Sequence, residues 1–282
     1  MTPLWVDRSG QFSPLKAATL ACAFLPGLVL AGQWIADDLG PRPFTEVTHG
    51  TGLWMVRFLM LSLAVSPARA IFSWPRLMLI RRMLGLTALA YGIAHLGLYI
   101  FDQGGNVIHV ASEIVRRFYL TIGFVALMGL VVLGVTSTDA MIRRLGRKWK
   151  TLHRLVYPIA VLGLLHYFLQ AKLNVWEPTL VAGLFVWLMA WRAVPAQRQR
   201  SVFVLAGLAV FACVATAGLE VAWYGLTTAI DPMRVFMSNF TLARGLRPAH
   251  WVGIVGVAIV VLAVLRQNVF QPQPRVRTAR SA

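Results

Sequence analysis

The chain has 282 residues, of which 58% are hydrophobic and only 13% are charged. Soluble globular domains carry about a quarter charged residues, so this composition excludes an ordinary soluble domain. The formal net charge of +17 would suit a nucleic-acid-binding protein, but the distribution of the charges indicates another origin.

Long apolar segments recur along the whole sequence, and the charged residues gather between them. A run of about 20 apolar residues can cross the hydrocarbon core of a bilayer as a helix, which satisfies its own backbone hydrogen bonds there. The sequence therefore predicts an all-α fold, a polytopic transmembrane helical bundle of about eight spans. The predicted spans are Leu15–Ile35, Gly50–Ser66, Met83–Phe101, Phe118–Ser137, Thr151–Ala171, Trp176–Trp191, Val202–Gly225 and Trp251–Leu265.

These spans divide the chain into three predicted parts. Residues 1–44 hold an N-terminal tail and the first span, residues 45–195 hold the central spans, and residues 196–282 form an extension with two further spans and a basic tail. No glycine-rich nucleotide fingerprint follows a strand, and no loop is long enough for a soluble domain. Any redox reaction must therefore exchange electrons with a separate partner.

The charges of the loops predict the orientation. With eight spans, nearly all arginine- and lysine-rich loops fall on one side of the membrane, including residues 143–150, whereas the opposite loops are balanced in charge. Because basic loops stay in the cytoplasm, both termini are predicted to be cytoplasmic. The excess of basic residues then reflects topology and contact with anionic membrane lipid, not binding of nucleic acid.

Three of the six histidines lie inside predicted spans, namely His95 in the third and His153 and His166 in the fifth. Histidines within a membrane usually face the bundle interior and have a function. Both spans run outward, and a rise of about 1.5 Å per residue places His95 and His166 at a similar depth in the outer half. Two imidazoles on facing helices are a usual axial pair for a haem that transfers electrons. The alternative is that these histidines only form hydrogen bonds between packed helices.

His153 precedes His166 by 13 positions, which places it near the inner surface. The position on the third span at the same depth is Arg82, which is not a metal ligand. A haem on His153 would therefore be incompletely ligated or would use another ligand, and a different cofactor is a further possibility. Pro158 lies between the two histidines, so the helix between them can be kinked and their relative direction stays open.

Several charged residues inside or beside the spans are further candidates. Arg57 lies about two turns inside the second span, where it either extends to the surface or pairs with haem propionates. Arg82 and Arg154 flank the inner site and are either ordinary cytoplasmic-side residues or ligands of a flavin phosphate. Glu220, in the seventh span, has no evident partner, which leaves interior packing or a proton-linked role.

A series of short motifs between about residues 45 and 192 resembles the MsrQ (YedZ) family, the haem-binding membrane subunits of the bacterial periplasmic methionine-sulfoxide reductase system. This family is itself part of the ferric reductase-like transmembrane family, whose haem-binding core corresponds to residues 45–195 here. The motifs that carry the resemblance are Thr51–Trp54, Arg57–Leu59, Ser66–Pro67, Arg81–Leu86, Tyr91–His95, Arg117–Tyr119, Thr136–Ser137, Leu145–Trp149, Leu152–Tyr157 and His166–Tyr167.

The resemblance implies a cytochrome of the bacterial inner membrane that passes electrons from the quinone pool to a periplasmic molybdopterin-containing reductase, which repairs oxidised methionines. It also implies haem b on His95, His153 and His166, and bound flavin mononucleotide (FMN). The chain departs from the family by its two additional spans from about Val202 onward. We expect an electron-transfer subunit with no catalytic residue of its own.

Two other functions remain open at this point. The first is a ferric-reductase-like cytochrome b with a different electron donor or acceptor. The second is a membrane transporter without redox chemistry, whose histidines pack or relay protons. A spectrum of the purified protein separates the transporter from both cytochromes, because a transporter would lack haem absorption.

Overall fold

The computed structural model describes residues 5–6, 10–241 and 245–269, and this part of the chain is a helical bundle without β-strands. Its one β-like feature is an isolated bridge between Val6 and Phe12. The helices are α1 (Pro14–Ile35), α2 (Pro43–Ile71), the 3-10 helix η1 (Pro75–Leu77), α3 (Met78–Asp102), α4 (Val107–Arg116), α5 (Phe118–Val135), α6 (Asp139–Leu145), α7 (Arg147–His153), α8 (Val156–Ala171), α9 (Trp176–Ala193), α10 (Val202–Thr227), α11 (Pro232–Ser238) and α12 (Pro248–Val269). The polytopic helical fold is therefore confirmed.

Seven helical segments within the described residues are long and apolar enough to cross a membrane, with α7 and α8 counted as one. The remaining predicted span, the sixth, corresponds to α9, an 18-residue helix outside that set. Its mean hydropathy is lowered by three tryptophans and by Glu177 and Arg192 at its ends. Half of its residues are nevertheless buried, including Trp187 and Trp191, so α9 forms an interior wall of the bundle.

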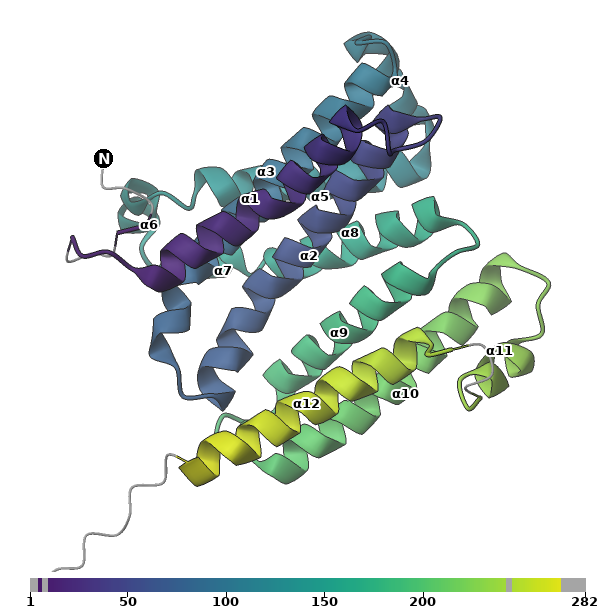
Figure 1. The fold of residues 1–282 in the computed structure, drawn as a ribbon. Coiled ribbons are helices and arrows are strands. Elements are labelled where there is room, and N and C mark those ends of the chain that lie inside the picture. Colours follow the sequence, from purple (N-terminus) through teal and green to yellow (C-terminus); the bar gives the residue numbers. More distant parts are fainter. Residues whose placement is uncertain (1–4, 7–9, 242–244, 270–282) are drawn as a thin grey trace, which may run out of the picture.

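The long helices lie side by side, with short elements at both ends of the bundle (Figure 1). The start of α1, the short helices α6 and α7 and the end of α12 lie at one end, whereas α4 and α11 lie at the other. This arrangement agrees with a predicted topology in which the basic loops share one side. The predicted basic tail, residues 270–282, lies outside the described residues.

Two predicted spans differ from the observed helices. The second is longer than predicted, because α2 extends from Pro43 to Ile71 through Pro67. Pro67 has no N–H to donate to the carbonyl of Leu63, four residues earlier. Arg192 of α9 donates to that carbonyl instead, with an Nη2–O distance of 2.5 Å. A side chain from a distant segment thus allows the helix to continue past the proline.

The fifth predicted span is interrupted. Helix α7 ends at His153, and α8 begins at Val156 after a turn through Arg154 and Leu155. The proline at position 158 lies in the first turn of α8, where its missing N–H has least effect on the helix. His153 and His166 therefore belong to two successive helices and not to one straight helix.

The C-terminal helices pack on α9 through small residues. A Cβ atom at Gly183 of α9 would lie 2.1 Å from the hydroxyl of Thr216 in α10 and 2.8 Å from Val252 in α12. A Cβ atom at Gly256 of α12 would lie 2.5 Å from the Cβ of Ala209 in α10. Such close approach of backbones is the usual means of helix association in lipid.

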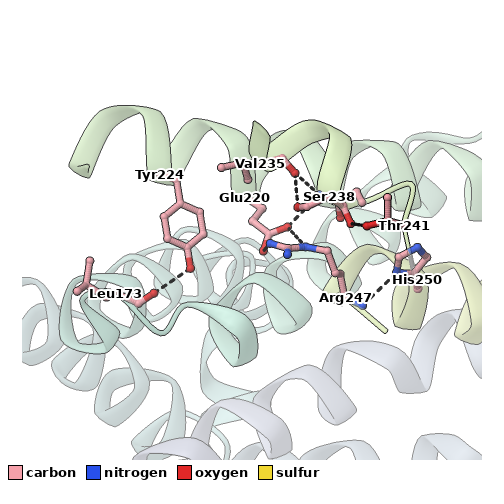
Figure 2. Close-up of polar contacts among 9 residues, drawn as sticks. Leu173, Glu220, Tyr224, Val235, Ser238, Thr241, Arg247 and His250 are labelled. Atoms are coloured by element: carbon pink, nitrogen blue, oxygen red, sulfur yellow. Dashed lines mark hydrogen bonds and ion pairs between the residues drawn. The ribbon is translucent and has the colours of Figure 1, made fainter. Parts of the chain in front are cut away.

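A polar cluster at the end of the bundle that contains α11 provides the partner of Glu220 (Figure 2). The Glu220 carboxylate is buried and accepts two hydrogen bonds from Arg247, at 2.6 Å from Nη2 and 3.2 Å from Nε. Asn239, just after α11, donates to the same carboxylate at 3.1 Å. The backbone N–H of Arg247 donates to Nδ1 of His250. Glu220 therefore joins α10, α11 and the start of α12, a role the sequence did not indicate.

Candidate haem site

The structure brings His95 and His166 together, as their predicted depths required. His95 is on α3 and His166 is on α8. Their ring centroids are 6.4 Å apart, and the ring planes cross at 83°. Two residues 71 positions apart in the sequence therefore face each other across the bundle interior.

The ring of His95 is held by the backbone of α2. Its Nδ1 lies 2.8 Å from the carbonyl oxygen of Thr48. The ring also lies directly over Gly52, where a Cβ atom would be 2.9 Å from Nδ1 and 3.0 Å from Cε1. Any larger residue at position 52 would occupy the space of the ring, so this glycine allows α2 to approach the histidine closely.

The ring of His166 is held in the same way by α5. Its Nδ1 lies 2.7 Å from the carbonyl oxygen of Tyr119. A Cβ atom at Gly123 would be 2.6 Å from Nδ1, 2.8 Å from Cε1 and 2.9 Å from Cγ. In both cases the carbonyl belongs to the residue four positions before the glycine, so both histidines rest on one turn of a neighbouring helix.

These contacts fix the protonation of both rings. A carbonyl oxygen only accepts, so Nδ1 carries the proton in each histidine and Nε2 keeps a free lone pair. Metal-ligating histidines usually donate their other N–H to a backbone carbonyl or carboxylate in this manner. The hydrogen bonds to α2 and α5 therefore leave both Nε2 atoms with a lone pair that is able to ligate a metal ion.

The separation of the rings fits one metal ion between them. Two metal–nitrogen bonds of about 2 Å each, with about 1 Å from each nitrogen to its ring centre, place the ring centres about 6 Å apart. The observed 6.4 Å is close to that value. No group of three or more possible metal-ligating side chains exists among the described residues.

Unlike His95 and His166, His153 does not face another histidine among the described residues. Its ring stacks on Trp149 with centroids 3.9 Å apart, and its Nδ1 lies 3.2 Å from the carbonyl oxygen of Trp149. Its Nε2 is 3.3 Å from the hydroxyl of Ser137. That hydroxyl makes a shorter hydrogen bond, 2.7 Å, to the carbonyl of Leu133. Both ring nitrogens of His153 thus make only long polar contacts, and ligation by His153 stays a prediction.

The three arginines named as candidates have different surroundings. Arg57 pairs with Glu177 at the start of α9, at 3.0 Å, and its guanidinium lies 4.8 Å from the centre of the Trp54 ring. Arg82 pairs with Asp139, the first residue of α6, at 2.5 Å. Arg154 lies in the turn between α7 and α8. A propionate role for Arg57 and a flavin role for the other two stay predictions.

Sequence reasoning missed the residues that hold the imidazole rings. Thr48 and Tyr119 contribute backbone oxygens, and the type of side chain at a position does not reveal such a contact. The glycines at positions 52 and 123 could have predicted these contacts, since each lies at the depth of a histidine on a neighbouring span. Glycine within a membrane helix often marks a close contact with another helix.

The segment that carries the first two intramembrane histidines is shared with known proteins. Residues 50–164 match the family described as ferric reductase like transmembrane component. The chain is 44% identical over 200 residues to the protein-methionine-sulfoxide reductase heme-binding subunit MsrQ of Rhodospirillum rubrum, and the match covers 69% of this chain and 92% of that protein. Proteins of the same name from Azospira oryzae and Xanthomonas campestris pv. campestris are each 42% identical. These matches cover 65% and 63% of this chain, and 80% and 84% of those proteins. No solved structure matches the chain.

Proposed function

The chain belongs to the MsrQ family of haem-binding subunits of protein-methionine-sulfoxide reductases, and from this premise we propose that it carries electrons within a bacterial inner membrane. In this proposal electrons from the quinone pool pass through haem b to a periplasmic molybdopterin-containing reductase, which reduces methionine sulfoxide in envelope proteins. The observation that carries the proposal is the His95–His166 pair, with its free Nε2 atoms and a separation that fits one iron.

Haem bound at this pair would supply a one-electron carrier, the iron alternating between its ferric and ferrous states. The chain's own contribution is to hold both imidazoles as neutral ligands by donation from Nδ1 to Thr48 and Tyr119. With His95 and His166 both as ligands, the iron would have no open position for a substrate, which would favour electron transfer over reaction at the metal. The sulfoxide is therefore reduced on the partner, and this chain has the role of an electron-transfer subunit.

The orientation of the proposal rests on the ends of the bundle. His166 lies on α8, which runs from the end that contains α6 and α7 toward the end that contains α4 and α11 (Figure 1). Basic residues are concentrated in α6 and α7, which supports a cytoplasmic location for that end. Electrons would then leave toward the periplasmic end, where the partner docks, and both termini would be cytoplasmic.

Three finer parts of the proposal come from the family. His153 is proposed as a further haem ligand, and Arg57 as a partner of a haem propionate if the guanidinium exchanges Glu177 for it. FMN is proposed as a second cofactor. No group of described residues singles out a flavin site, so no step is assigned to FMN.

The first test is a reduced-minus-oxidised absorption spectrum of the detergent-purified protein, with haem per chain measured as the pyridine haemochrome. We expect a b-type spectrum, abolished in His95→Ala and in His166→Ala. His153→Ala should keep this haem and lower only additional haem. Wild-type protein without haem, after expression with ample haem supply, would refute the proposal and favour a transporter.

A second candidate is a ferric-reductase-like cytochrome b with another donor or acceptor, which the family match over residues 50–164 favours. The two candidates differ in the partner that accepts electrons. Co-expression with a periplasmic molybdopterin reductase should restore sulfoxide reduction only if the first proposal is right. Reduction of ferric chelates without such a partner would support the second.

A further inference from the structure

Helix α11 lies in the connection between α10 and α12 (Figure 1), which the predicted spans place outside the membrane, yet it folds back along α10. At its start, the ring of Pro232 lies 3.2 Å from the position that a Cβ atom of Gly225 would occupy. Just after its end, Asn239 donates to the carboxylate of Glu220, at 3.1 Å. Because Glu220 precedes Gly225 on α10, α11 runs from the end of α10 back toward the middle of that helix.

The neighbouring end of α8 gives the level of the membrane surface. Lys172 directly follows α8, and its ammonium group must reach water or lipid headgroups. Trp223 and Tyr224 of α10 donate to the carbonyls of Lys172 and Leu173, at 3.2 and 2.8 Å, and Figure 2 shows the contact of Tyr224. Tryptophan and tyrosine concentrate at the membrane–water interface. Residues 223 and 224 therefore mark the surface, and Glu220 lies about one helical turn, or about 5 Å, below it.

The end of α11 does not depend on water for its hydrogen bonds. The last four carbonyls of a helix have no donor within the helix itself. In α11 each of the four accepts from within the chain: the carbonyls of residues 235 and 238 from the side chains of Ser238, Asn239 and Thr241, and those of residues 236 and 237 from the backbone N–H groups of residues 239 and 240. Figure 2 shows the hydroxyl contacts. A helix end satisfied in this way is able to enter lipid, where no water replaces a missing donor.

The exposed side chains of α11 change from charged to apolar as the helix leaves the surface. Asp231 and Arg234, at its start, are exposed. Met237 and Phe240, at its deeper end, are 54% and 70% exposed, whereas the polar side chain of Asn239 beside them is buried. A helix that faces water has its apolar side chains inward and its polar side chains outward. The deeper end of α11 has the reverse arrangement, which suits contact with lipid.

We propose that α11 is an interfacial helix whose outward face, formed by Met233, Phe236, Met237 and Phe240, lies against the phospholipid of the adjacent leaflet. The deeper end contacts the acyl chains near the headgroups, and Arg234, at the start, lies at the level of the lipid phosphates. The depth of about 5 Å is within the range usual for such helices, about 5–10 Å. The partner of this face is lipid and not a soluble protein, because the face lies below the membrane surface.

The polar cluster around Glu220 holds α11 in this position. Arg247 neutralises the Glu220 carboxylate through an ion pair at 2.6 Å, so no uncompensated charge lies at this depth. Asn239 joins the end of α11 to the same carboxylate. The inference concerns the position of the C-terminal extension in the membrane and does not depend on the electron-transfer role. It removes α11 from the surfaces on which the proposed reductase partner could dock.

The test uses the full-length, haem-loaded protein in phospholipid vesicles. Both native cysteines are replaced with alanine, and single cysteines are introduced by Met233→Cys, Met237→Cys or Phe240→Cys. Each is labelled with nitrobenzoxadiazole, a fluorophore whose emission shifts to shorter wavelength in an apolar medium. Asp38→Cys, in the exposed turn between α1 and α2, is the control for water, and Phe211→Cys, 53% exposed within α10, is the control for lipid. Iodide quenches the label from water, and nitroxides on the lipid headgroup or acyl chain quench it from two depths.

The labels at positions 237 and 240 should emit at shorter wavelength than the label at position 38. They should lose most of their fluorescence to the acyl-chain nitroxide and little to iodide, as at position 211. The label at position 233, nearer the surface, should respond more strongly to the headgroup nitroxide. Haem absorbs part of the emission of every label, so each ratio compares one position with and without quencher. Haem per chain identifies any labelled variant that does not fold, and the remaining position then decides the question.

Two results would overturn the inference. Iodide quenching at positions 237 and 240 as strong as at position 38 would show a face open to water and to a soluble partner. Protection of both positions from iodide and from the lipid nitroxides would show a face covered by protein, such as a second copy of this chain. Neither result would affect the proposed electron transfer, which the haem spectrum tests separately.

Discussion

The substitution Gly123→Ala tests whether haem binding depends on the close contact of the His166 ring with the backbone of α5 at Gly123 and Tyr119. A methyl group at this position would lie 2.6 Å from Nδ1 of His166 and within 2.9 Å of two of its carbon atoms. The ring cannot retreat without losing its hydrogen bond to Tyr119, about 0.5–1.5 kcal/mol. Overpacking adds about 1–3 kcal/mol. A total of about 1.5–4.5 kcal/mol corresponds to haem affinity lowered by about 10- to 1,500-fold, at about 1.4 kcal/mol for each factor of ten.

The assay is haem per chain by pyridine haemochrome after expression with limiting haem. Gly52→Ala should lose less haem than Gly123→Ala, because its methyl group would lie farther from the His95 ring, at 2.9 and 3.0 Å. Gly97→Ala on α3 and Gly163→Ala on α8 are matched controls, since neither added methyl group meets an atom within 4 Å. Equal haem content in Gly123→Ala and Gly163→Ala would refute the reasoning.

Three further predictions concern the ligand planes and two polar contacts. With haem iron bound between imidazole planes that cross at 83°, two iron d orbitals would be nearly equal in energy, so the oxidised protein should show a strongly anisotropic low-spin electron paramagnetic resonance signal. A rhombic three-line signal would mean parallel rings. Arg192→Leu should destabilise the protein by about 1–3 kcal/mol, because the Leu63 carbonyl loses its donor beside Pro67, and an unchanged thermal midpoint in detergent would contradict this. Glu220→Gln should cost about 3–5 kcal/mol by breaking the buried pair with Arg247, and replacing both residues with leucine should recover most of that loss in the same assay.

The positions of the helices and the meeting of two histidines were predictable because they depend on one-dimensional quantities. Apolar length locates a span, and a rise of about 1.5 Å per residue gives the depth of each side chain along it. Depth alone placed His95 and His166 at one level. Depth does not give the direction in which a side chain points, so the sequence left open whether the rings face each other.

The features that the sequence did not reveal depend on contacts between distant segments. Helix α2 continues through Pro67 because Arg192, 125 positions later, donates to the freed carbonyl. Glu220 appeared to lack a partner because Arg247 approaches it from beyond another helix. Local patterns cannot report such pairs. The interruption between α7 and α8 is similar, since Pro158 suggested a kink without giving its position.

The backbone contacts of His95 and His166 also explain how two histidines alone can define the site. Each imidazole is fixed by a carbonyl and a glycine on a neighbouring helix, so α2 with α3, and α5 with α8, form two half-sites that face each other. His153 is held by longer contacts: its ring rests on Trp149, its Nδ1 lies 3.2 Å from the carbonyl of Trp149 in its own helix, and its Nε2 lies 3.3 Å from the hydroxyl of Ser137. The geometry therefore favours one haem held rigidly by His95 and His166, and any cofactor at His153 should be held more weakly and be lost first on purification.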